Sequence, residues 1–105
     1  MKRGEVWTVS GTAGKPRPAV IVQDDRFDAT GSVTVCVFTT DETEAPLFRL
    51  AVAPSDRNRL RSVSRPMVDK PPTVSKDRIG ARIGRLDDQD VVRVNRAIVV
   101  YLGLA

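Results

Sequence analysis

An arginine and a threonine at the ends of two neighbouring apolar segments are the residues best placed to do chemistry. Arg17 precedes Pro18 and the apolar residues 19–22, and a proline biases the residue before it toward extended backbone. Thr39 follows the apolar segment 33–38. If these ends converge, the guanidinium could hold a phosphate through two parallel hydrogen bonds while the hydroxyl donates to a phosphate oxygen. The pair therefore suggests phosphodiester chemistry.

Both side chains also have simpler interpretations. Arg17 could be one solvated charge among many, and Thr39 and Thr40 could satisfy the backbone of a local turn, as most loop threonines do. Arginine is a poor proton acceptor because its pKa lies above about 12, so we assign Arg17 mainly to stabilising transition-state charge. RNA supplies its own nucleophile, the 2′-hydroxyl, so such a site would need neither a metal nor a protein nucleophile.

Composition limits the alternatives. The 105 residues make one domain, 1–105, and Lys+Arg of 17 against Asp+Glu of 13 gives a net charge of +4, which is compatible with a polyanionic partner. Histidine is absent, so the commonest acid/base group and metal ligand is missing. With Cys36 as the one cysteine, we expect no zinc site, no cofactor and a buried, inert thiol.

The sequence shows no targeting or membrane signal. Residues 1–5 are followed by no apolar segment of the signal-peptide kind, and no apolar run approaches membrane-spanning length. We therefore expect a cytoplasmic protein that does not enter membranes.

The elements that must position Arg17 and Thr39 are predominantly strands. Apolar and alternating patterns predict strands over residues 4–9, 19–22, 33–38 and 47–52, an edge strand over 64–69 interrupted by Pro66, and a short extended piece over 81–83. Ser75 is placed to cap one helical turn that ends at Ile79. In this arrangement Arg17 belongs to the loop before the second strand.

Residues 86–102 predict the one long helix. Val91, Val94, Ile98 and Leu102 share one face, and Asp87 or Asp88 is placed to cap it. The apolar arc is wide enough for contact with both the sheet and a partner. The fold class is therefore mainly β with one C-terminal helix, either a small barrel or a curled antiparallel sheet.

Other polar residues could support binding. Arg57, Arg59 and Arg61 form the densest basic stretch and could contact phosphates, although a solvated surface loop explains them as well. Asp69 is the nearest candidate for an accessory carboxylate, and its simpler interpretation is a turn residue that pairs with an arginine.

Three segments in register carry a family resemblance. They are RGEVW at residues 3–7, KPRPAVIVQ at 15–23 and VCVFTT at 35–40. Together with Asn58-Arg59-Leu60, where the family often has Asn-Gly-Leu, they resemble the MazF/PemK family of toxin endoribonucleases. The resemblance covers nearly the whole chain.

This resemblance implies an SH3-like barrel with a C-terminal helix, a fold shared with CcdB-like toxins, and a homodimer. It also implies metal-independent, sequence-specific cleavage of single-stranded RNA to a 2′,3′-cyclic phosphate and a 5′-hydroxyl. A cognate antitoxin with an acidic C-terminal segment would inhibit the toxin by covering its groove. Arg17 and Thr39 correspond to the family's catalytic positions. The residues expected to contact RNA are Lys15, Thr40, Arg57, Arg59, Asp69 and Lys70.

Departures from the family pattern leave alternatives open. Asp69-Lys70 is followed by two prolines, where the family often has Gln, a β-branched residue and a basic one. A gyrase poison of the CcdB type would carry its function, including a tryptophan, near the C-terminus, and residues 101–105 contain none. A nucleic-acid-binding module without activity is the third interpretation.

Overall fold

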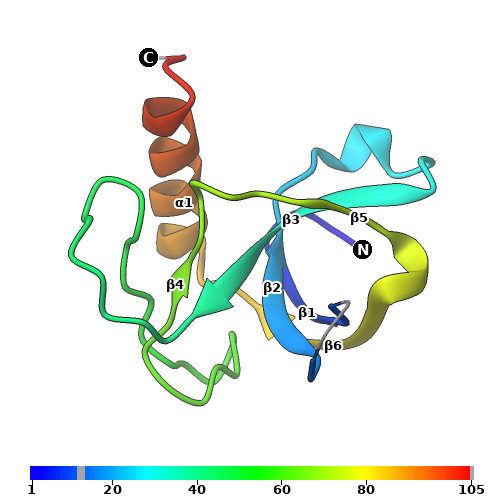
Figure 1. The fold of residues 1–105 in the computed structure, drawn as a ribbon, viewed down its shortest axis with the longest axis horizontal. Coiled ribbons are helices and arrows are strands. Elements are labelled where there is room, and N and C mark those ends of the chain that lie inside the picture. The colour runs from blue at the N-terminus through cyan, green and yellow to red at the C-terminus, as the bar shows by residue number, and fades with distance from the viewer. Residues whose placement is uncertain (12–13, 105) are drawn as a thin grey trace.

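The computed structural model describes residues 1–11 and 14–104, which form a curled antiparallel sheet with one C-terminal helix beside it (Figure 1). The strands are β1 (Glu5–Val9), β2 (Arg17–Ile21), β3 (Ser32–Thr39), β4 (Arg65–Pro66), β5 (Thr73–Ser75) and β6 (Ile79–Arg85). Two 3₁₀ turns, η1 (Asp25–Phe27) and η2 (Lys76–Arg78), and the helix α1 (Asp88–Tyr101) complete the chain. The predicted fold class is confirmed.

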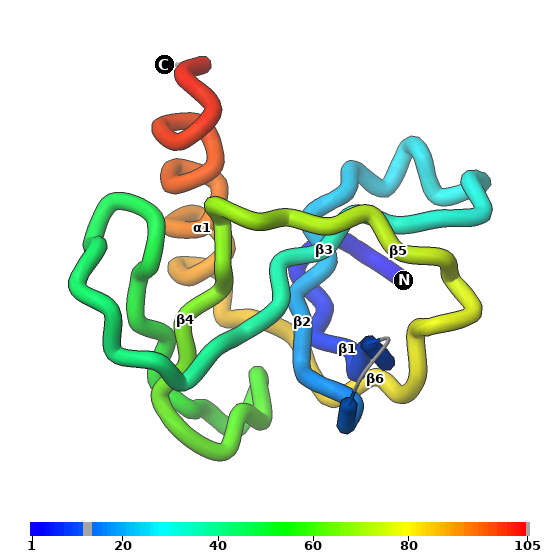
Figure 2. The backbone as a smooth tube through the Cα atoms, viewed as in Figure 1, coloured from blue at the N-terminus to red at the C-terminus, as the bar shows by residue number. Residues whose placement is uncertain are grey.

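The strands follow the order β4-β3-β2-β1-β6, and β5 pairs with the other end of β3. In the described part of the chain the two end strands, β4 and β6, do not pair with each other, so the sheet is curled but not closed into a barrel. Figure 2 shows the same course of the backbone, with α1 and β4 on the left of the view and β5 on the right. Met1 packs against the cluster that includes Val33 and Val35 of β3.

The central strands bury side chains on both faces. Val20, Cys36 and Phe38 face α1 and join Leu86 and Val94 in one apolar cluster. On the other face, odd-numbered residues of β1, β2 and β3 form a second cluster, made of Val9, Ala19, Ile21, Val33 and Val35. Side chains alternate along a strand, so a strand covered on both faces reads as a continuous apolar run. Burial raises the pKa of the Cys36 thiol to about 12, as expected for an inert group.

The strand predicted over residues 47–52 is wrong. The backbone N–H groups of Phe48 and Arg49 both donate to the Ala45 carbonyl oxygen, so this segment begins as a turn. Only Val52 pairs in the β manner, with Ser64. The alternating pattern arose because Leu50 and Val52 both enter the apolar cluster under α1, not because a neighbouring strand is present.

Other boundaries shift by a few residues. Strand β2 begins at Arg17, so this residue lies in a strand rather than in the predicted loop. The predicted edge strand shrinks to Arg65–Pro66, and β6 is longer than predicted. Ser75 caps η2 by accepting a hydrogen bond from the Asp77 N–H, as predicted, although the turn is 3₁₀ rather than α-helical.

The helix α1 packs Val94 and Ala97 against the sheet. Asp87 is its N-cap residue, but its carboxylate accepts from the Ser55 hydroxyl at 2.7 Å instead of from the first turn. Leu102 lies beyond the helix end and is 56% exposed, so it does not join the buried face as predicted. Val100, Tyr101 and Leu104 are also exposed. In the described residues no helix is long and apolar enough to cross a membrane.

Candidate functional site

The candidate site lies at the end of the sheet where β2 begins and β3 ends. Arg17 pairs with Val9 of β1, and Ala19 pairs with Val37 of β3. Continuing the β2–β3 register by two residues sets Thr39 across from Arg17. Side chains two residues apart along a strand share a face. Arg17 and Thr39 therefore lie on the same face of the sheet as the second apolar cluster, which contains Val9 and Val35. The structure thus brings the two predicted catalytic positions to one face and one end of the sheet.

Pro18 is tolerated in β2 because of its position. A proline cannot donate to a strand ladder and is therefore confined to edges and strand starts. The β3 ladder begins only at Ala19, so at Pro18 the strand is paired with β1 alone, opposite Thr8. This arrangement fixes the backbone next to Arg17 without the loss of a central hydrogen bond.

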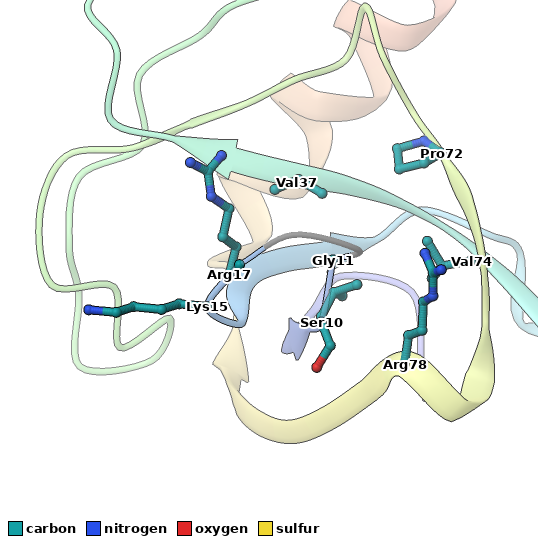
Figure 3. A pocket seen from close by; sticks show the side chains of 10 residues that line it. Ser10, Gly11, Lys15, Arg17, Val37, Pro72, Val74 and Arg78 are labelled. Carbon is teal, nitrogen blue, oxygen red and sulfur yellow. The ribbon is translucent and has the colours of Figure 1, made fainter.

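A groove of about 710 Å³ opens beside Arg17; we call it the first groove. Three cationic residues, Lys15, Arg17 and Arg78, contribute to its lining. Figure 3 shows Arg17 and Arg78 on opposite sides, with Ser10 between them, while Lys15 extends away from Arg78. Apolar side chains, Val9, Val37 and Val74, also line it. The groove therefore combines an apolar surface with fixed positive charge, which suits an extended polyanion.

The Thr39 hydroxyl already has one backbone partner. Its oxygen accepts a hydrogen bond from the Asp41 N–H at 3.1 Å, which is the turn role of the simpler interpretation. A hydroxyl that accepts this bond keeps its own proton free to donate. The observed contact is therefore compatible with donation to a phosphate oxygen and also holds the side chain in one orientation.

The other predicted binding residues are dispersed. Thr40 and Arg59 line a separate groove on the opposite face, described below as the second groove. Arg57 pairs with Asp88 at 3.4 Å near the start of α1. Lys70 is exposed in the turn after Asp69. Of the predicted binding residues, only Lys15 lines the first groove with Arg17.

Asp69 is engaged by an arginine. Its two carboxylate oxygens accept from Nε and Nη2 of Arg49 at 2.7 and 3.0 Å. These hydrogen bonds from Arg49 hold the pKa of Asp69 below its ordinary value. The carboxylate is therefore in its acceptor-only, ionised form, and its charge is already matched.

Arg78 is a groove residue that the sequence analysis did not single out. Its carbonyl oxygen accepts from the Ser10 N–H at 2.9 Å, and Val9 pairs with Ile79 of β6. The pairing of β1 with β6 brings η2 to the end of β1 and so delivers Arg78 to the groove. The capped turn after Ser75 was predicted, but the pairing of β6 with β1 was not. Arg78 could have been identified as a groove residue only if that pairing had been predicted.

The first groove's arginines are not matched by carboxylates of the chain. Within residues 1–11 and 14–104, Arg17 and Arg78 form no ion pair, whereas Arg26, Arg49, Arg57, Arg82 and Arg93 each do. An exposed guanidinium with free donors is a ready partner for phosphate. The first groove therefore presents two guanidinium groups that have no carboxylate partner among the described residues, unlike the five paired arginines named above.

A small, mainly β domain with a cationic groove at one end of a curled sheet is the class of protein that the fold and site define. A family profile described as "PemK-like, MazF-like toxin of type II toxin-antitoxin system" matches residues 2–102. The chain therefore belongs to this family of toxins.

Individual relatives agree with this assignment. The chain is 48% identical, over all of its length and 99% of the relative, to a probable endoribonuclease MazF of Mycolicibacterium smegmatis. Its structure resembles an endoribonuclease in complex with its cognate antitoxin from a mycobacterial species, with a TM-score of 0.85 and 27% identity over 100% of this chain and 97% of the other. It shares the fold of the Mycobacterium tuberculosis toxin MazF-mt6, with a TM-score of 0.83 and 20% identity over 96% and 98% of the two chains.

Proposed function

We propose that this toxin is an endoribonuclease that cleaves single-stranded RNA in the first groove without a metal ion. The observation that carries the proposal is the placement of Arg17 and Thr39 on one face at one end of the sheet, beside a groove with unpaired cations. The relatives named as endoribonucleases support the reaction class.

The proposed chemistry is an intramolecular transesterification. The 2′-oxygen of one nucleotide attacks the adjacent phosphorus and loses its proton, the bond to the 5′-oxygen breaks, and that oxygen gains a proton. The products are a 2′,3′-cyclic phosphate and a 5′-hydroxyl. Arg17 donates to the non-bridging oxygens, where negative charge develops. Thr39 donates its free hydroxyl proton to the same phosphate and so fixes its orientation.

The partners follow from the same groove. A cognate antitoxin would place an acidic segment over Arg17 and Arg78, which occupies the cations that RNA needs. Support comes from the relative that is described in complex with its antitoxin. We also place the toxin in the cytoplasm, where RNA and the antitoxin meet it, and as a homodimer formed through the exposed apolar residues at the end of α1.

The test is the chemistry of the ends that the protein makes. Purified protein is incubated with mixed cellular RNA in EDTA, and the new ends are mapped. We expect discrete cuts that leave 5′-hydroxyls and cyclic phosphates, and no cut where the nucleotide 5′ to the bond carries a 2′-O-methyl group. Cleavage that requires added metal and leaves 5′-phosphates would contradict the proposal. Inhibition of gyrase supercoiling without RNA cuts would favour the gyrase-poison alternative.

A further inference from the structure

A second groove, of about 500 Å³, opens on the opposite face of the same sheet end. Its lining includes apolar side chains from Pro16, Pro18 and Ile83, the cations Arg59 and Arg61, and the hydroxyl of Thr40. This combination of an apolar surface, guanidinium groups and a hydroxyl is suited to a nucleotide, which has a flat base face, a phosphate and polar edges.

The two grooves adjoin at the first residues of β2. Lys15 and Arg17 line the first groove, while Pro16 and Pro18 line the second. This division follows from the alternation of side chains along an extended backbone. Only the thickness of one strand therefore separates the grooves, and Arg17 lies at the boundary.

The segment that carries Arg59 is held rigidly in an unusual conformation. Arg59 has a φ of +56°, a region where glycine is favoured because it has no Cβ. The fully buried Asn58 fixes the turn, because its Oδ1 accepts from the N–H groups of Ser55 and Leu60, each at 2.9 Å. Its Nδ2 donates to the Ala53 carbonyl oxygen, also at 2.9 Å. An arginine in a backbone conformation that favours glycine is a reason to look for a role at that place.

The distribution of unpaired arginines singles out the same end of the sheet. Within the described ranges, the arginine side chains with neither an ion pair nor a hydrogen bond to the protein are Arg17, Arg59, Arg61, Arg78 and Arg96. Apart from Arg96 on α1, all of them line one of the two grooves. The free guanidinium donors of the chain are thus gathered around the start of β2.

We propose that the second groove binds nucleotides that flank the cleaved bond, on the same RNA strand that the first groove holds. This inference rests on the proposed function. The strand crosses the start of β2 at Arg17 and continues onto the other face, where Arg59 and Arg61 bind its phosphates. A base lies against Pro16, Pro18 and Ile83, and Thr40 contacts its edge. The second groove therefore contributes affinity for long substrates and selects bases outside the cleaved step.

The experiment compares a short and a longer single-stranded 2′-O-methyl RNA, whose affinities are measured by fluorescence anisotropy over a range of salt concentrations. These RNAs cannot be cleaved, so binding is measured independently of activity. The test variant is Arg59→Gly/Arg61→Gln, in which the glycine suits the positive φ of position 59. The control is Arg26→Gln/Arg96→Gln, which removes the same charge away from both grooves.

The wild type should bind the longer RNA more tightly than the short one. The test variant should lose about tenfold in affinity for the longer RNA, and the slope of its affinity against salt should fall by about 1.4, the value for two lost phosphate contacts. Affinity for the short RNA and both affinities of the control should change little.

Equal loss in the test and control variants would overturn the inference, because it would show a general charge effect. So would an unchanged affinity for RNA together with a weakened affinity for poly-glutamate, since the second groove would then serve an acidic polypeptide. The end mapping described above tests the proposed function separately. Normal cleavage with unchanged RNA binding by the test variant would contradict this inference alone.

Discussion

Arg49 and Asp69 form a nearly buried, bidentate ion pair, in which the two side chains are 10% and 12% exposed. The contacts of 2.7 and 3.0 Å join the turn after residue 45 to the turn after β4. A shielded pair of this kind carries a large penalty when one partner is removed, because the other charge remains without a counter-ion. The pair therefore indicates a role for Asp69 in stability rather than in proton transfer.

Asp69→Asn should lower the free energy of unfolding by about 2 kcal/mol at pH 7, measured by urea denaturation. The pKa of Asp69 is lowered in the folded state by Arg49, so its contribution is present above the unfolded pKa. That contribution is lost as the pH falls through the folded value, below about pH 4. The difference between variant and wild type should shrink there.

Asp28→Asn is the control, because its pair with Lys76 is long, at 3.8 Å, and the Asp28 side chain is 54% exposed. Solvated pairs of this kind contribute little to stability. An Asp69→Asn effect that stays the same at acid pH would contradict the assignment. A large loss of RNA cleavage with unchanged stability would instead give Asp69 the accessory-carboxylate role considered from the sequence.

Gly84 should tolerate no side chain. A Cβ there would lie 2.5 Å from the Arg57 carbonyl oxygen and 2.8 Å from that of Asn58, both of which are backbone atoms. We expect Gly84→Ala to cost about 2 kcal/mol or more in unfolding free energy, because the turn that carries Asn58 must move. Gly31→Ala, which meets nothing within 4 Å, should leave the unfolding midpoint near that of the wild type. Equal midpoints for the two variants would refute the close contact.

Thr39→Val separates the two roles of the hydroxyl. The side chain keeps its shape but loses both the bond from Asp41 N–H and the proton proposed for the phosphate. We expect kcat to fall by about 10- to 100-fold, and Thr39→Ser to recover most of it. A lower melting temperature with kcat unchanged would show that the hydroxyl serves only the local turn.

The exposed end of α1 should be the dimer contact. Val100, Tyr101 and Leu104 lie within five consecutive residues and are 51%, 47% and 73% exposed. Large exposed apolar patches mark interaction sites. Val100→Lys should shift the sedimentation of the protein from dimer to monomer. Phe27→Lys, at an exposed apolar residue of η1, is the matched control. A wild type that sediments as a monomer, or a Val100→Lys variant that stays dimeric, would contradict the assignment of this surface as the dimer contact.

The local sequence pattern was sufficient to predict the buried strands and the C-terminal helix. The apolar runs at 19–22 and 33–38 correspond to strands buried on both faces. Of the predicted helix face, Val94 is buried, and Val91 and Ile98 pack against the same cluster. Arg17 and Thr39 could be paired in advance because the start of one strand lies beside the end of the next when two consecutive strands pair in the antiparallel sense. The register then sets the two side chains on the same face.

The structural features that the sequence did not predict depend on contacts between residues far apart in the chain. Leu50 and Val52 alternate with less apolar residues because both side chains pack into the core with Leu86 and Val94. The pattern therefore does not mark a strand. Arg49 is oriented by a carboxylate twenty residues away. Arg78 reaches the first groove only because β6 pairs with β1, so its role was invisible to any local pattern.

Removal of the Arg17 guanidinium tests most directly whether this residue stabilises the transition state of RNA cleavage in the first groove. Cleavage of one defined RNA is timed in EDTA for the wild type and for Arg17→Ala, with circular dichroism melting as the check on folding. Because Arg17 is exposed at a strand end, we predict an unchanged melting temperature and a rate lowered by about 100- to 1,000-fold. Cleavage by Arg17→Ala at the wild-type rate would contradict the account.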